Sequence, residues 1–126
     1  MSQEKKKPTI YQIVTGVLSF FRSEIITNDK LAISRAFCAL KIDGFGLLQD
    51  IMFGNDNESR EIEEIFSRFL TTGLVRYGEW GSGTYHLYKE VLIELRRELP
   101  KDFTAEEIIQ LSEIAEELEK MIAIRT

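Results

Sequence analysis

Residue types that commonly carry catalysis are sparse in this chain of 126 residues. His86 is the one histidine of the sequence, and its alternation with Thr84 and Tyr88 places it on one face of a strand. A lone strand histidine is typical of a structural or solvent-facing position. Cys38, the one cysteine, lies in the apolar helical run AFCAL, which is typical of a buried and inert thiol.

Carboxylates are the next candidates for acid–base or metal chemistry. They occur along helical stretches as solvated faces, with no histidine or cysteine partner at metal-ligand spacing. The short glycine pairs GFG and GSG lack the strand-to-helix context of a phosphate-binding loop. We therefore expect no enzymatic activity, no metal and no cofactor. These helical carboxylates are Glu61, Glu63, Glu64, Glu116, Glu117 and Glu119.

Basic and hydroxyl side chains form a second candidate set, because they contact phosphates and base edges in DNA complexes. Arg60, Glu64 and Arg68 share one helix face at a spacing of four residues. Three consecutive lysines near the start of the chain form a basic arm. The candidate DNA contacts are Lys5, Lys6, Lys7, Ser59, Arg60, Arg68, Arg76, Ser82, Thr84 and Lys89.

The overall charge weighs against a tight nucleic-acid binder. The formal net charge is −5, with fourteen acids and thirteen bases in residues 1–100 and seven acids and three bases in residues 101–126. Residues 58–72 carry four glutamates and two arginines, a net charge of −2. Glutamates that face phosphates repel them. Pairing with Glu64 on the helix surface, worth ~0.2–0.5 kcal/mol per pair, is an alternative role for Arg60 and Arg68.

The chain begins with a basic tail over residues 1–8, and residues 9–126 are expected to form one domain. Thr9 and Gln12 form a capping box that starts a helix. Residues 10–26 are apolar on nearly all sides, which indicates a buried helix. This helix is either the centre of the fold or shared with a second subunit.

The middle of the chain predicts three further helices. Asn28 or Asp29 caps a helix that Gly44 ends. A short helix closes at Gly54, and a longer amphipathic helix over residues 59–72 closes at Gly73. Each glycine follows an apolar helical pattern, as is typical of helix C-termini.

A β-hairpin is predicted over residues 74–88, with Trp80 at its tip. A lone hairpin is marginal in water, so it must pack against a helix. Trp80 either anchors an interface or folds back onto its own strands. The hairpin is followed by an amphipathic helix that Pro100 is expected to stop.

The last helix, residues 104–123, opens with a capping box of Thr104 and Glu107. Its apolar residues repeat at spacings of three and four, which suits either packing within the domain or a dimer seam. With Trp80, they form the candidate dimer or partner interface: Ile108, Leu111, Ala115, Leu118 and Ile122.

The predicted fold class is mainly α with one β-hairpin. The helices and strands follow one another as in a winged helix-turn-helix, with extra N-terminal and C-terminal helices. The stretches FSRFLTTGLVRYGEW and TYHLYKE carry this order. Residues 30–95 resemble the PadR-like branch of the winged-helix regulators. That resemblance implies a transcriptional regulator that binds DNA as a homodimer.

Two segments depart from that family pattern. The start of the expected recognition helix reads NESREIEEI, and the tip of the wing offers Trp80 and small residues where arginine and lysine are usual. An alternative is therefore a winged-helix module that binds a protein partner and no DNA. A single cysteine and the absence of an apolar run long enough to cross a membrane are typical of a cytoplasmic protein.

Overall fold

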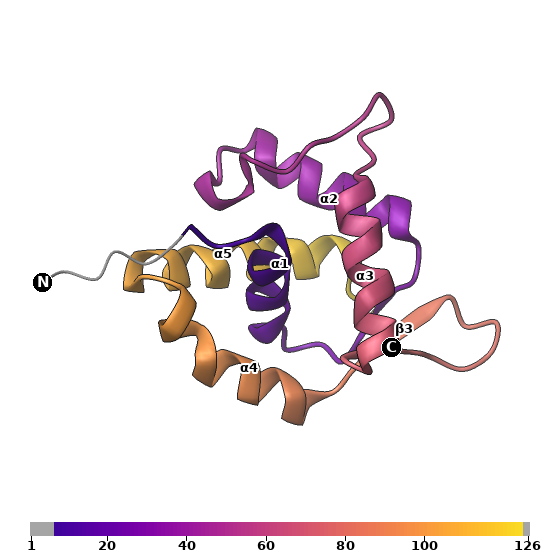
Figure 1. Ribbon diagram of the computed structural model, residues 1–126. Helices are drawn as coiled ribbons and strands as arrows, with labels where there is room; N and C mark the ends of the chain where they lie inside the picture. Colours follow the sequence, from indigo (N-terminus) through magenta and orange to yellow (C-terminus); the bar gives the residue numbers. More distant parts are fainter. Residues whose placement is uncertain (1–6, 125–126) are drawn as a thin grey trace, which may run out of the picture.

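The computed structural model describes residues 7–124, which fold into five α-helices, a short 3₁₀ helix and a small three-stranded antiparallel sheet (Figure 1). The elements follow the order α1 (Ile10–Ser19), β1 (Ile25–Thr27), α2 (Lys30–Ile42), η1 (Gly46–Leu48), α3 (Arg60–Thr72), β2 (Val75–Tyr77), β3 (Thr84–Leu87), α4 (Lys89–Asp102) and α5 (Ala105–Ile122). The mainly helical class is therefore confirmed.

Helix α1 lies at the centre of the molecule, in contact with α3, α4 and α5 (Figure 1). Its capping box is present: Gln12 N donates to Thr9 Oγ1 at 3.1 Å, and Thr9 N donates to Gln12 Oε1 at 2.9 Å. The helix ends at Ser19, so the prediction of a helix as far as residue 26 is wrong. Ile25 and Ile26 suit a buried strand as well as an apolar helix, and their strand partner lies about sixty residues later.

The sheet has the strand order β1-β3-β2, so the predicted hairpin carries a third strand that was not expected. Ile26 pairs with Tyr85, and Tyr85 pairs with Tyr77 on the other side. Because side chains alternate across a sheet, this row shares one face and Arg76 and His86 lie on the other. Beyond α5, Ala123 forms an antiparallel bridge with Ile26.

Helix α2 begins at the second of its two predicted caps. The carboxylate of Asp29 accepts hydrogen bonds from Leu31 N at 3.0 Å and Ala32 N at 3.1 Å. Gly44, with φ of 101°, follows the end of the helix as expected. The predicted helix that closes at Gly54 is much shorter, because η1 covers residues 46–48 alone.

Helix α3 forms where the amphipathic pattern predicts it. Ser59 caps its N-terminus and accepts a hydrogen bond from Ile62 N at 3.2 Å. Gly73 closes it in the left-handed conformation, with φ of 82°. The apolar face, which includes the fully buried Phe66 and Phe69, packs into the core beneath the sheet.

Helices α4 and α5 follow the sheet and complete the described chain. Helix α4 continues through Pro100 to Asp102, so the prediction that Pro100 stops it is wrong. The last turn is held by a hydrogen bond from Phe103 N to Leu99 O at 2.9 Å, and both of these side chains are buried. The capping box of Thr104 and Glu107 opens α5 as predicted.

None of the helices within residues 7–124 combines the length and apolar character needed to cross a membrane.

Candidate nucleic-acid interface

The outward face of α3 carries a polar stripe, which we name the α3 stripe. Its members are exposed and recur at helical spacing: Arg60, Glu64, Ser67, Arg68 and Thr71. Two arginines against one glutamate give the stripe a net charge of +1. The two guanidinium groups can donate to phosphate oxygens and base edges. The hydroxyls of Ser67 and Thr71 already donate to the backbone oxygens of Glu63 and Ser67, each at 3.1 Å.

The glutamates of residues 58–72 are not all on this stripe. Glu61 is half-buried, and its carboxylate accepts a hydrogen bond from Met52 N at 3.2 Å in the preceding loop. Glu61 and Glu63 also lie in the first turn of α3, where the helix dipole favours negative charge. Two of the four glutamates in residues 58–72 therefore stabilise the start of the helix.

Neighbouring elements add positive charge to the α3 stripe. Lys30 on α2 donates from Nζ to Ser67 Oγ at 2.8 Å. The guanidinium of Arg68 lies 5.9 Å from the centre of the Tyr11 ring, a cation–π contact with α1. Lys30 was not predicted as part of this surface, because only the packing of α2 against α3 brings it there. Ser67 and Thr71 were identifiable from their helical spacing to Arg60.

The hairpin presents two aromatic side chains to solvent. Trp80 at the tip is fully exposed, and Tyr77 is 69% exposed. The turn is braced below the tip by a 2.7 Å hydrogen bond between Ser82 Oγ and Thr84 Oγ1 and by one from Gly78 N to Thr84 O at 2.9 Å. Trp80 therefore projects instead of folding onto its own strands.

Arg76 does not join the α3 stripe. It pairs in register with His86 on the outer face of the sheet, and its guanidinium lies 4.8 Å from the centre of the Tyr88 ring. The opposite face of the sheet carries Tyr85, whose ring stacks on Phe66 of α3. Arg76 is thus directed away from α3. Lys89 is exposed and begins α4.

Other candidate DNA contacts lie elsewhere. Ser59 and Thr84 are buried, the first as a helix cap and the second as a brace of the hairpin turn, so neither offers a free hydroxyl to a phosphate. Ser82 is exposed but bonded to Thr84. Lys7 forms an ion pair with Asp50 in the loop after η1. Lys5 and Lys6 lie outside the described residues.

The apolar repeat of α5 faces the core of its own chain. Leu111, Ala115, Leu118 and Ile122 are buried, and Ile108 is half-buried against them. Packing within the chain therefore accounts for the heptad spacing. These residues are not available as a dimer seam in this fold.

Burial raises the pKa of the Tyr85 phenol above its ordinary value of 10.0, and the neighbouring Tyr77 adds to the shift. Its phenol is therefore neutral around neutral pH and acts in packing. Within residues 7–124, no three histidine, cysteine, aspartate or glutamate side chains gather in a group that could hold a metal ion.

Comparison of the chain with protein families found no matching family, and comparisons with curated proteins and with solved structures found no match either.

Proposed function

We propose that this chain is a winged-helix protein that binds double-stranded DNA through α3. The order of the elements supports this assignment: it runs α1-β1-α2-α3-β2-β3. Strand β1 is added to the hairpin at the β3 edge. In this assignment α2 and α3 are the paired helices, α3 enters the major groove, and the β2–β3 hairpin is the wing. Helices α4 and α5 are additions to that unit.

The observation that carries the proposal is the composition of the α3 stripe. Its arginines lie eight residues apart on one exposed face, with Ser67 and Thr71 on the same side. The contact of Lys30 with Ser67 adds a third positive charge at the middle of the stripe. A major groove about 12 Å wide admits a helix with such a face.

The test is fluorescence anisotropy with a labelled duplex of about 30 base pairs at two salt concentrations, roughly 50 and 200 mM. We expect binding to weaken steeply as salt rises, because each phosphate contact releases a counterion. Replacing Arg60 and Arg68 with glutamine should reduce the salt slope by about two.

Arg97→Gln is the matched control. Arg97 is exposed on α4 and pairs with Glu94 at 3.2 Å, away from the α3 stripe. Its loss removes one positive charge, as each of the two replacements on α3 does, and should leave binding nearly unchanged. Binding that is absent at the lower salt concentration, or equally reduced by Arg97→Gln, would refute a DNA site at α3.

A second candidate function is a protein-binding module, and the full exposure of Trp80 favours it. Exposed tryptophans are frequent anchors of protein interfaces. If the duplex does not bind, the next experiment is a search for protein partners that compares the unaltered chain with Trp80→Ala. A partner lost on Trp80→Ala and kept on Arg97→Gln would support this second function.

We propose that the protein acts as a homodimer, as the resemblance implies for regulators of this kind. The buried repeat of α5 cannot supply the contact, so a dimer has to use surface outside it. Sedimentation velocity over a range of protein concentrations tests this proposal. A single species of monomer mass at all concentrations would refute it.

A further inference from the structure

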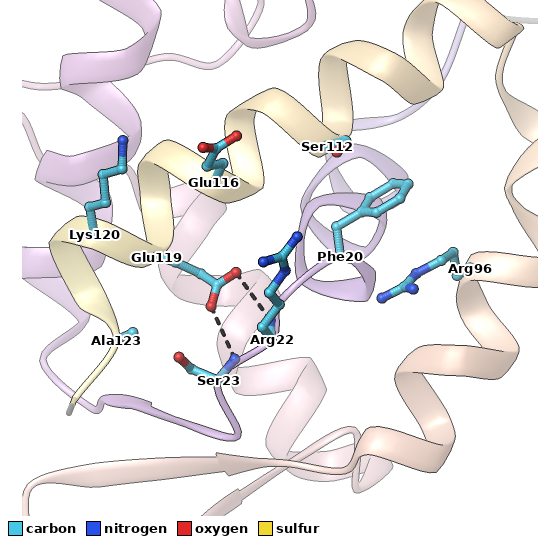
Figure 2. Close-up of a pocket in the computed structure, with 9 residues that line it drawn as sticks. All are labelled: Phe20, Arg22, Ser23, Arg96, Ser112, Glu116, Glu119, Lys120 and Ala123. Carbon is cyan, nitrogen blue, oxygen red and sulfur yellow. Dashed lines mark hydrogen bonds between the residues drawn. The ribbon is translucent and has the colours of Figure 1, made fainter. Parts of the chain in front are cut away.

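A hollow of about 390 Å³ lies between the end of α1, α4 and α5. Figure 2 shows that Arg22, from the segment after α1, and Arg96, from α4, both direct their guanidinium groups into it. Phe20 forms part of its wall, and Glu116 and Glu119 on α5 line the other side. The volume falls in the range of small-molecule sites, roughly 300–1,000 Å³.

Arg96 is held in a fixed orientation. Its Nε and Nη2 donate to the carbonyl oxygen of Ser19 at 3.0 and 2.6 Å, and its guanidinium lies 5.0 Å from the centre of the Phe20 ring. The Ser19 carbonyl belongs to the last turn of α1, where the helix dipole favours a positive charge. These contacts occupy one edge of the guanidinium and leave the Nη1–Nη2 edge for a ligand.

Arg22 has no acceptor for its guanidinium among residues 7–124. The Glu119 carboxylate of α5 is engaged with the backbone, because it accepts hydrogen bonds from Arg22 N at 3.1 Å and Ser23 N at 3.0 Å (Figure 2). Lys120, at the rim, pairs with Glu117 at 3.1 Å. Two guanidinium groups therefore enter one hollow, and within the described chain neither forms an ion pair with a carboxylate.

We propose that this hollow binds a small molecule through an oxyanion group, a carboxylate or a phosphate, held between Arg22 and Arg96. Guanidinium donors match the planar geometry of carboxylate and phosphate oxygens, and hydrogen bonds between charged groups are the stronger kind. The fixed Arg96 supplies a pre-ordered donor edge, which lowers the entropy lost on binding. Glu116 and Glu119 line the same hollow, and their negative charges should weaken the binding of an anion. The inference does not depend on DNA binding.

The test follows the amide and Arg side-chain Nε–H signals of the full chain by ¹H–¹⁵N NMR. The probes are inorganic phosphate and succinate, each compared with chloride at equal ionic strength. We expect saturable shifts of Arg96 Nε–H and of the backbone around Ser23 with one of the two oxyanions and not with chloride. A response to phosphate alone assigns a phosphate group, and one to succinate alone assigns a carboxylate.

Three variants decide whether the response belongs to the hollow. Arg22→Gln should weaken binding by roughly tenfold, since it removes a charged hydrogen bond from an exposed residue that the fold does not need. Glu116→Gln should strengthen binding, because it removes the opposing charge. Arg97→Gln, on the same helix as Arg96, should leave it unchanged.

Shifts that chloride reproduces, or the absence of saturation with both oxyanions, would overturn the proposal. An equal loss of affinity in Arg22→Gln and Arg97→Gln would also overturn it, because it would show a general response to surface charge. A failure of duplex binding at α3 would not change these NMR signals, so the two proposals are tested independently.

Discussion

The ring of Tyr85 on β3 stacks on the ring of Phe66 on α3, with centroids 6.2 Å apart and an angle of 13° between the ring planes. Phe69 meets Phe66 edge-on at 5.2 Å, which extends the contact along α3. Offset aromatic pairs of this kind add ~0.5–1.5 kcal/mol beyond the burial of their surface. These ring contacts therefore link the hairpin to α3.

Phe66→Ala should destabilise the fold by roughly 3–5 kcal/mol, because it leaves a cavity and removes both ring contacts. Denaturation in urea, followed by circular dichroism, measures this loss. Trp80→Ala is the control, since a fully exposed side chain should change the free energy of unfolding by about 0.5 kcal/mol or less. Similar losses in the two variants would contradict the assignment of Phe66 as the link between hairpin and helix.

Gly78→Ala should destabilise the hairpin. A methyl group at Gly78 would overlap the Thr84 hydroxyl oxygen and lie 3.1 Å from both Ser82 Oγ and His86 Cδ2. The hydrogen bond between Ser82 and Thr84 would have to break to make room. Hydrogen exchange of the β3 amides should accelerate in this variant. Unchanged protection there would show that the turn accommodates the methyl group.

The free energy of unfolding should fall as the pH rises above about 10. The raised pKa of Tyr85 means that the folded state keeps a proton that the unfolded chain has already released. Below this range both states hold the proton, and the group adds no pH dependence. Tyr85→Phe should flatten the alkaline limb of a stability profile measured by urea denaturation. If Tyr85→Phe leaves the fall in stability above about pH 10 unaltered, the pH dependence there belongs to other groups.

Leu118→Glu should abolish cooperative unfolding, instead of merely converting a dimer into a monomer. Leu118 is fully buried within its own chain, and an unpaired charge there costs more than a marginally stable fold supplies. Leu118→Met, which conserves volume, should cost less than about 1.5 kcal/mol. A Leu118→Glu variant that stays folded and is monomeric, where the unaltered chain is dimeric, would restore the interpretation of α5 as a dimer seam.

Local signals in the sequence placed the helix starts well. The capping boxes at Thr9 and Thr104 and the cap at Asp29 are present, because each depends on residues no more than three positions apart. The left-handed glycine at Gly73 is equally local. Strand β1 was missed because its identity depends on pairing with β3, which no local pattern records.

The candidate surfaces were predicted less well than the elements that carry them. The spacing of Arg60 and Arg68 identified one face of α3 correctly as exposed, whereas Ser59 and Thr84 are buried by the caps and turns they hold. The repeat of α5 could not distinguish a core face from a dimer face, because both need the same spacing. The hollow between Arg22 and Arg96 was not predicted, since its two arginines meet only through the packing of α1 against α4 and α5.

The bridge between Ile26 and Ala123, continued by a hydrogen bond from Ile124 N to Ile25 O at 3.0 Å, has a consequence for assembly. It covers the side of β1 that does not face β3. An open strand edge is a template on which another chain can extend the sheet and begin to aggregate. Here the chain occupies that edge with its own backbone, which leaves β2, three residues long, as the remaining edge strand of the sheet.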